Sequence, residues 1–525
     1  MKSINGDDTG WLNHTRWARL QIRDWRVEYA SHMTTPTAQD RAFFGHPRGL
    51  STLFFTEMWE RFSYYGMRAL LLLYMTAPLS AGGLGFDAAQ GGAVYGLYTS
   101  MVYLATMPGG WIADRLIGPR RAVLYGGIII AAGHFSMAIP SLATFYLGLF
   151  LIVIGTGLLK GNVSVIVGKL YGAADIRRDA GFSIFYMGIN LGAFLAPLVC
   201  GYLGQQVSWH LGFAAAGFGM LIGVIQYVMG GTNLGDAGIA PAPAPTPEIA
   251  AQWKRQVQSW VGGGAALVVV AALAAYFGLL QVSATQVSDA AGVFLLLVVV
   301  GFFGWLMFSG GWTPDEKKRL YVITVLFFAA SLFWSVFEQA GSTLNLFADR
   351  STRNEAFGMA YPSSWFQSMN SLFIFAFAPV LAWLWVRLAS TGKEPISPTK
   401  FAFGLIFVGA GFLILVIPAR TAEQGALVSP MWLTATYFLH TIGELVLSPV
   451  GLSAMTTLAP ARIGGLMMGV WFLATSVGNF IGGRVSGFYE SFALPTLFGS
   501  VAAFAIVAGF ILLALVPSMR KLTKA

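Results

Sequence analysis

Six polar side chains recur along one face of the first apolar run of this sequence. They are Glu57, Glu60, Arg61, Tyr64, Tyr65 and Arg68. At about 100° per residue, their spacing places them within an arc of about 140° on a helix. An ionisable group is costly to bury in an apolar membrane span, so this stripe indicates a functional face directed at a watery cavity or at buried partners. The alternative is a set of structural ion pairs that hold helices together.

Three other apolar runs each contain one charged residue. Lys160 lies in the sequence Gly-Leu-Leu-Lys-Gly-Asn, Glu338 follows Trp-Ser-Val-Phe, and Glu444 lies in His-Thr-Ile-Gly-Glu-Leu. A cavity with cations on one side and a carboxylate on the other would recognise the two charged ends of a short peptide. It would do so without regard to the side chains.

Neutral polar and aromatic residues accompany these charges. Asn190 and Asn370 lie in the middle of apolar runs, where an asparagine either contacts a ligand or forms a hydrogen bond between helices. The aromatic candidates for pocket walls, which could equally be packing residues, are Tyr103, Trp334, Phe337 and Trp471. His134 and His440 could titrate near neutral pH, but we expect both to be packing residues.

The composition excludes a soluble protein. Of 525 residues, 56% are hydrophobic and 10% are charged, whereas a soluble domain has about 25% charged residues. The net charge of +9 is carried by residues that flank the apolar runs and form no single patch, so we expect no nucleic-acid binding. The single cysteine, Cys200, permits no intrachain disulfide. No cluster of metal ligands and no pairing of a nucleophile with a base is evident, so we expect no enzyme, no metal site and no cofactor.

The apolar runs number fourteen, each about as long as the 20 residues that a bilayer requires of a helix. We expect helices near 50–77, 90–113, 120–139, 142–168, 180–204, 208–230, 258–280, 288–310, 319–346, 360–388, 400–418, 428–456, 463–488 and 494–517. The sequence therefore predicts an all-α membrane protein of six helices, two inserted helices and six more. Two six-helix halves packed about an axis along the membrane normal are the plan of the major facilitator superfamily.

The expected organisation has five parts. They are a polar N-terminal segment (1–47), a first six-helix bundle (48–230), a linker with two inserted helices (231–318), a second six-helix bundle (319–518) and a short tail (519–525). The inserted helices contain no charge over 261–280 and 290–308, so we expect lipid-facing structural helices there. The first forty residues contain no apolar core followed by a cleavage site, so we expect no signal peptide.

Basic residues predict the orientation in the membrane. With the N-terminus in the cytoplasm, Arg115, Lys169, Lys318 and Lys521 lie inside, and chiefly Arg350, Arg353 and Arg420 remain outside. This bias places both termini in the cytoplasm of a bacterial inner membrane. We expect the chain to function as a monomer in the bilayer.

Depth along the helices predicts two pairs of charges. Arg68 and Glu338 each lie about 27–29 Å along spans that run outward, whereas Lys160 and Glu444 lie in the inner half of spans that run inward. We expect Arg68–Glu338 to close the outer side and Lys160–Glu444 the inner side, in alternation. The alternative is that these charges contact only substrate.

Several motifs resemble those of the proton-dependent oligopeptide transporter family. The run from Glu57 to Gly66 is similar to its ExxERFxYYG signature, and Gly109 to Asp114 is similar to its first loop signature. The sequence Phe-Tyr-Met-Gly-Ile-Asn ending at Asn190 resembles its fifth-helix signature, and the surroundings of Trp334, Glu338 and Glu444 also match. The resemblance covers about 48–517, and the two inserted helices are similar to those of bacterial members.

This resemblance implies symport of di- and tripeptides with protons. It assigns Arg61, Arg68 and Lys160 to the peptide carboxylate, and Glu444, Asn190 and Asn370 to the peptide amino group. It assigns Glu57, Glu60 and Glu338 to proton coupling. The implied side-chain pockets are formed by Tyr64, Tyr65, Tyr103, Trp334 and Trp471.

Two departures from the family pattern concern the site. Gly161 stands where many members have proline, and Phe337 stands where some have a second glutamate. The second span contains no histidine, so proton coupling would rest on carboxylates. The alternative function is proton-coupled transport of another small anion, such as nitrate or a conjugated acid, which would need the cations but not Glu444.

Overall fold

The structure is a computed structural model that describes residues 40–523, apart from 173–174, 242–243, 277–282 and 357. The expectation for the first forty residues therefore lies almost entirely outside the described residues. Each of the fourteen expected spans overlaps at least one helix over its described residues. In the described part of the chain, nine helices are long and apolar enough to cross a membrane by length and composition alone. The prediction of an all-α membrane protein is confirmed.

The first half contains α2 (Arg48–Thr76), α3 (Ala88–Leu104), α4 (Thr106–Ile112), α5 (Pro119–Met137), α6 (Leu142–Lys169), α7 (Arg178–Tyr202) and α8 (Trp209–Met229). The inserted helices are α9 (Pro247–Tyr276) and α10 (Ala284–Phe308). The second half contains α11 (Pro314–Phe337), α12 (Thr343–Arg350), α13 (Ser368–Ser390), α14 (Ser397–Ala422), α15 (Pro430–Leu458), α16 (Met467–Ser486) and α17 (Leu494–Thr523). A two-stranded hairpin of β1 (Glu355–Ala356) and β2 (Met359–Ala360) follows α12.

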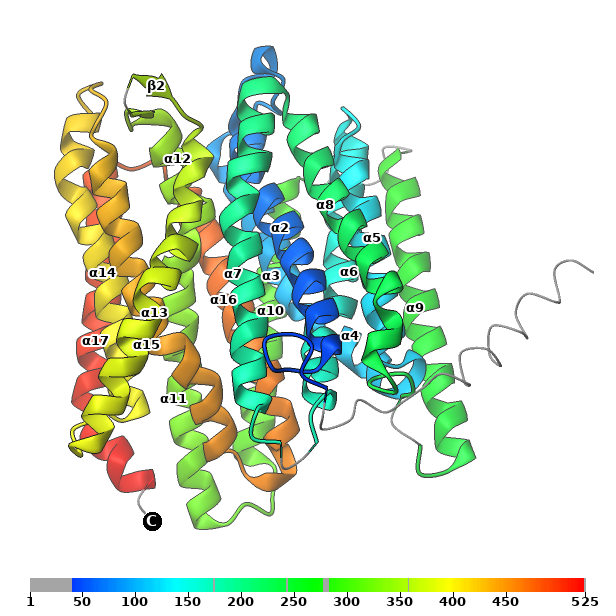
Figure 1. Cartoon of the computed structure of the whole chain (residues 1–525). Coiled ribbons are helices and arrows are strands. Elements are labelled where there is room, and N and C mark those ends of the chain that lie inside the picture. The colour runs from blue at the N-terminus through cyan, green and yellow to red at the C-terminus, as the bar shows by residue number, and fades with distance from the viewer. Residues whose placement is uncertain (1–39, 173–174, 242–243, 277–282, 357, 524–525) are drawn as a thin grey trace, which may run out of the picture.

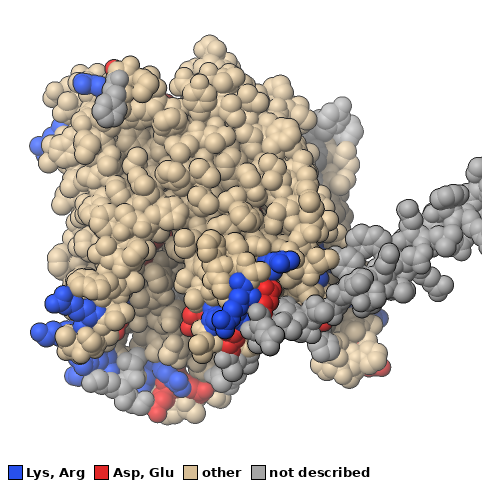
Figure 2. All heavy atoms as spheres, in the orientation of Figure 1, with Lys and Arg blue, Asp and Glu red and all other residues tan. Residues whose placement is uncertain are grey.

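The two halves stand side by side, with α9 at the outer edge of the first half (Figure 1). We call the end of the bundle where α2 begins and α17 ends the terminal end. The opposite end, which holds α12 and the β-hairpin, is the distal end (Figure 1). Lysine and arginine side chains gather mainly along the lower, terminal edge of the molecule, and the band above that edge is free of visible charge (Figure 2). This distribution is the one expected of a bundle surrounded by lipid.

Small residues let the two halves approach closely where α3 crosses α16. A Cβ atom at Gly483 would lie 2.2 Å from the Cα atom of Gly96, and one at Gly92 would lie 2.6 Å from the carbonyl oxygen of Gly483. Glycine is therefore required at this crossing, as is common where membrane helices pack tightly. The crossing joins the halves near the distal end.

Two expected spans are interrupted, which corrects the sequence-based boundaries. The expected helix over 319–346 ends at Phe337, and a 3₁₀ segment (Glu338–Gly341) leads into α12. This segment is closely packed against the first half, because a Cβ atom at Gly341 would lie 2.0 Å from the Tyr95 hydroxyl oxygen and 2.7 Å from Arg68 Nε. The expected helix over 90–113 breaks between α3 and α4 at Ala105.

Candidate functional site

The stripe on α2 lies inside the first half. Glu57, Glu60, Arg61, Tyr64 and Arg68 are all less than 5% exposed. Arg61 is the centre of a small network: it forms an ion pair with Glu60, and its Nε atom lies 3.3 Å from Glu57. The Arg61 guanidinium also lies 5.1 Å from the centre of the Tyr64 ring. Arg61 is therefore held by two carboxylates and is not available to a ligand carboxylate in this conformation.

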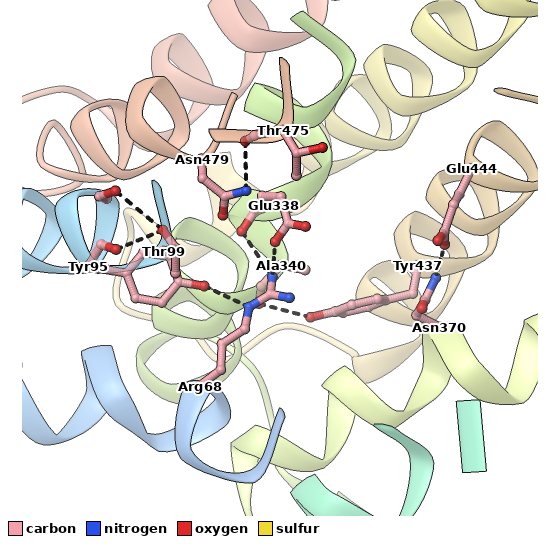
Figure 3. Close-up of polar contacts among 11 residues, drawn as sticks. Arg68, Tyr95, Thr99, Glu338, Ala340, Asn370, Tyr437, Glu444, Thr475 and Asn479 are labelled. Carbon is pink, nitrogen blue, oxygen red and sulfur yellow. Dashed lines mark hydrogen bonds and ion pairs between the residues drawn. The ribbon is translucent and has the colours of Figure 1, made fainter. Parts of the chain in front are cut away.

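Arg68 joins the two halves. Its Nη2 atom lies 2.7 Å from the Glu338 carboxylate, and the same nitrogen donates a hydrogen bond of 3.3 Å to the Glu338 carbonyl oxygen. Its Nε atom donates to the hydroxyl of Tyr95 on α3 at 2.8 Å. Figure 3 shows the guanidinium held between Tyr95 and Glu338. The pair that depth along the helices predicts is thus formed, and it lies towards the distal end.

Further hydrogen bonds between the halves gather around the same end. They are Asn345 Nδ2 to the Ala69 carbonyl (2.9 Å), Ser100 with Ser476 (2.8 Å), Gln205 Nε2 to Ser363 (2.7 Å) and the Trp365 indole to the Leu198 carbonyl (3.2 Å). At the distal surface, the backbone N–H of Ala88 in the first half donates a hydrogen bond of 3.0 Å to the carboxylate of Glu490 in the second. The distal end is therefore closed by contacts between the halves.

Lys160 is placed differently from the two arginines. Its Nζ atom lies 4.1 Å from the centre of the Tyr103 ring and 5.9 Å from that of Tyr64. Among the described residues, no carboxylate lies within 4.0 Å of this ammonium group. The side chain is partly exposed although it lies in the membrane-spanning part of α6. Lys160 is therefore a basic residue with aromatic neighbours and, in the described part of the chain, no carboxylate partner.

Glu444 on α15 is the corresponding anion of the second half. Its carboxylate accepts a hydrogen bond of 2.8 Å from Asn370 Nδ2, which also lies 3.1 Å from the Thr441 hydroxyl (Figure 3). In the described part of the chain, Glu444 has no cationic partner within 4.0 Å, and it too is partly exposed. The expected Lys160–Glu444 pair is not formed in this conformation, in which the distal pair is.

The aromatic candidates for pocket walls are largely buried and contact one another or the charged residues. The rings of Trp334 and Trp471 lie 6.3 Å apart, and Phe337 lies 5.4 Å from Trp334. Each of these three side chains keeps about 8% of its surface exposed, as does Tyr103. Tyr65 is partly exposed beside Arg68, whose guanidinium lies 5.7 Å from its ring. The expected wall residues thus come from both halves.

Not every sequence candidate reaches another helix. Asn190 donates its side-chain hydrogen bond to the carbonyl of Tyr186, one turn earlier on α7 (3.0 Å), whereas Asn370 reaches Glu444. His440 is buried between the rings of Phe337 and Phe412, and His134 is fully buried.

Sequence reasoning missed Tyr95 and Thr441, because each is a neutral hydroxyl in an apolar run whose role depends on a neighbouring helix. Across the described residues, no three metal-ligating side chains lie close enough to hold a metal ion.

Comparison with known proteins places this geometry in context. A family model described as the POT family matches residues 120–501. The chain is 40% identical to a peptide transporter of Yersinia enterocolitica, over 93% of this chain and 98% of that protein. It is 37% identical to a di-/tripeptide transporter of Lactococcus lactis subsp. cremoris, over 92% and 98% of the two chains. The crystal structure of a peptide transporter POT in complex with sulfate superposes with a TM-score of 0.86 at 42% identity, covering 95% of this chain and 99% of that one.

Proposed function

This chain belongs to the POT family, and from that premise we propose that it is a symporter that imports di- and tripeptides with protons by alternating access. It is a transporter and not an enzyme. The observation that carries the peptide specificity is the pair Lys160 and Glu444. These two charges stand in opposite halves, are partly exposed, and have no partner of opposite charge within 4.0 Å among the described residues.

A peptide zwitterion is complementary to this arrangement. Its carboxylate would lie against Lys160, with Arg61 as a further cation once its own carboxylates release it. Its amino group would lie against Glu444 and the oxygen of Asn370, and Asn190 on α7 would be a further contact for it. The main-chain ends would then fix the ligand, and Tyr64, Tyr65, Tyr103, Trp334 and Trp471 would contact the side chains. Recognition of both ends accounts for tolerance of many peptide sequences.

Proton coupling is assigned to the carboxylates that hold the arginines. Protonation of Glu60 or Glu57 would remove a negative charge beside Arg61 and free the guanidinium for the peptide carboxylate. Protonation of Glu338 would leave Arg68 without its counter-charge in a buried position, which is strongly unfavourable. Protonation from the distal side would therefore open that side. No cofactor is required, because the proton gradient supplies the energy.

The conformation fits one half of an alternating cycle. Contacts between the halves close the distal end, whereas Lys160 and Glu444 remain apart, and Figure 2 shows the molecular surface hollowed between the halves towards the terminal end. We assign the terminal end, with its lysine and arginine residues, to the cytoplasmic side of a bacterial inner membrane, with both chain ends inside. The peptide site then faces the cytoplasm, and a monomer contains all the residues required.

The test is uptake by the purified protein in liposomes with an imposed pH gradient, acid outside. Labelled dialanine should accumulate, and unlabelled dialanine and trialanine should compete, whereas alanine and nitrate should not. Accumulation that nitrate or a conjugated acid abolishes, with no competition by dialanine, would replace peptide transport by transport of another small anion. Absence of any proton-driven uptake would remove the coupling.

A further inference from the structure

Arg115 is an exposed arginine that contacts aromatic rings and no described carboxylate. It lies in a single turn of π-helix (Ala113–Ile117) that continues α4. Its guanidinium carbon is 5.0 Å from the centre of the Trp111 ring and 4.7 Å from that of Trp253 on α9. Among the described residues, this guanidinium has no hydrogen-bond partner and no carboxylate within 4.0 Å. Its N–H groups therefore remain available to an anion from outside the protein.

The segments that meet at this contact have an excess of positive charge. Residues 111–121 contain three arginines and one carboxylate, and residues 247–260 contain one lysine, one arginine and one carboxylate. Arg121, Lys254 and Arg255 are exposed, and none of them forms an ion pair in the described part of the chain. Basic residues beside tryptophans at the end of a membrane helix are typical of the level of the lipid headgroups.

An apolar groove of about 830 Å³ begins on α4 and runs between α10 and the first half. Its lining includes Met107 and Pro108 of α4, Met101 of α3, Phe150 of α6 and Phe294 of α10. Met107, Phe150 and Phe294 are each more than a third exposed, so the groove opens on the outer surface of the bundle. At this depth the outer surface of a membrane protein faces the acyl chains of the bilayer.

The groove and the Arg115 guanidinium lie on one side of the same segment. At about 100° per residue, Met107, Pro108, Trp111 and Arg115 fall within an arc of about 100°. At about 1.5 Å per residue, Arg115 lies about 10 Å beyond Pro108, towards the terminal end. A cation at the headgroup level is thus followed, nearer the bilayer centre, by an apolar groove. This is the order of the charged and apolar parts of a phospholipid.

Beyond its contact with this segment, α9 has little protein around it. Trp260 lies 5.0 Å from Trp111, ring centre to ring centre. Further along α9, Val261, Val269 and Val270 point in different directions around the helix, and each is more than half exposed. Lipid therefore surrounds α9 directly above the contact with Arg115.

We propose that this side of the first half binds one phospholipid from the leaflet at the terminal end. Its phosphate lies on the Arg115 guanidinium, and one of its acyl chains lies in the groove between α10 and the first half. Arginine binds phosphate strongly because two of its N–H groups can donate to the same group. The surrounding positive charge favours an anionic lipid over a zwitterionic one. This site is separate from the proposed peptide site, and its binding is measured without peptide or proton gradient.

The headgroup contact is tested by native mass spectrometry of the full-length protein in detergent, with phosphatidylglycerol as the titrated lipid. Arg115→Ala should weaken binding of the first lipid by about 10- to 100-fold, the effect of a lost hydrogen bond to a charged group. Arg387→Ala is the matched control, because Arg387 is an exposed arginine of the second half whose guanidinium lies 5.3 Å from the centre of the Trp383 ring. Affinity in Arg115→Ala equal to that of wild type, or an equal loss in Arg387→Ala, would overturn the site.

The acyl-chain contact is tested by filling the groove. Val298 lines it, so Val298→Trp should abolish the rise in melting temperature that phosphatidylglycerol gives to the wild type. Val300→Trp is the control and should keep that rise, because Val300 is 60% exposed on α10 and lies outside the groove lining. Melting temperatures without lipid show whether each variant is folded. A full rise in Val298→Trp, or an equal rise when inorganic phosphate replaces the lipid, would overturn the phospholipid as the occupant.

Discussion

The Arg68 guanidinium and the Glu338 carboxylate meet across the two halves of the transporter at 2.7 Å, and each residue is 5% exposed or less. The pair joins the distal part of α2 to the end of α11, where the chain turns into a 3₁₀ segment. A buried charge that loses its partner is far more costly than an exposed one. We therefore expect the closed distal end to depend on the ionisation of the Glu338 carboxylate.

Replacing Glu338 by glutamine should open the distal end. The amide keeps the shape of the side chain but removes the charge, so we expect at least about a tenfold shift towards long distances between labels at Ser141 and Gln424, two exposed distal positions. The shift should be present at every pH, because the titrating group is gone. Asp315→Asn is the control, since Lys318–Asp315 is an exposed pair within α11 and should contribute little. A Glu338→Gln distribution like that of wild type and still sensitive to pH would show that the Arg68–Glu338 pair does not hold the distal end closed.

Replacing Glu444 by glutamine should weaken binding of peptides that carry a free amino group. A hydrogen bond to a charged group contributes about 1.5–3 kcal/mol, so the affinity for dialanine should fall by about 10- to 100-fold. N-acetyl-dialanine should bind weakly to both proteins and should lose nothing further in the variant. Competition against labelled dialanine in liposomes measures both ligands. Equal binding of acetylated and free dialanine to the wild type would show that Glu444 does not meet the amino group.

Replacing Glu60 by glutamine should separate transport from its driving force. Glu60 and Glu57 both hold Arg61, and only a carboxylate can release that guanidinium by taking up a proton. We expect accumulation of dialanine driven by an acidic exterior to be lost, while exchange of labelled for unlabelled peptide without a gradient continues. Full acid-driven accumulation by Glu60→Gln would place the proton path elsewhere.

Sequence reasoning reached this site because charges in membrane helices are rare and because depth can be calculated from helical rise. Arg68 and Glu338 lie at nearly the same distance along their helices, and that equality sufficed to pair them before the structure was known. Hydropathy could not reveal the break at Glu338–Gly341 or the part of Tyr95, because both depend on contact between helices distant in sequence. Nor could it tell which end is closed, since both conformations use the same helices.

Outside the membrane-spanning helices, His46 makes stability depend on pH. It precedes α2, is buried, and its Nδ1 atom lies 2.9 Å from the Tyr171 hydroxyl. Burial lowers the pKa of His46 below its usual 6.5, and the nearby Arg177 lowers it further, whereas Asp175 acts in the opposite direction. The unfolded chain then binds more protons than the folded one as pH falls below about 6.5, so the contribution of His46 is fully present above that pH and is lost below it. Thermal unfolding between pH 7.5 and 5.5 should show a shallower decline for His46→Gln than for wild type, and equal slopes would contradict this.

A substitution at Gly341 tests whether the Arg68–Glu338 pair depends on the backbone packed around it. An alanine there would place its Cβ atom 2.0 Å from the Tyr95 hydroxyl and 2.7 Å from Arg68 Nε, so one of these side chains must move. Forcing an extra methyl group into a packed core costs about 1–3 kcal/mol. We therefore expect Gly341→Ala to lower the melting temperature and to lengthen the distances between labels at Ser141 and Gln424.

The matched control is Gly304→Ala on α10, where a Cβ atom would meet nothing within 4 Å and where alanine is the better helix former. Gly341→Ala leaves every ionisable group in place, so the distances between the labels should still depend on pH. This distinguishes Gly341→Ala, which displaces the Arg68–Glu338 pair by packing, from Glu338→Gln, which removes its charge. Unchanged stability and distances in Gly341→Ala would mean that Arg68 and Tyr95 can move aside without loosening the distal end.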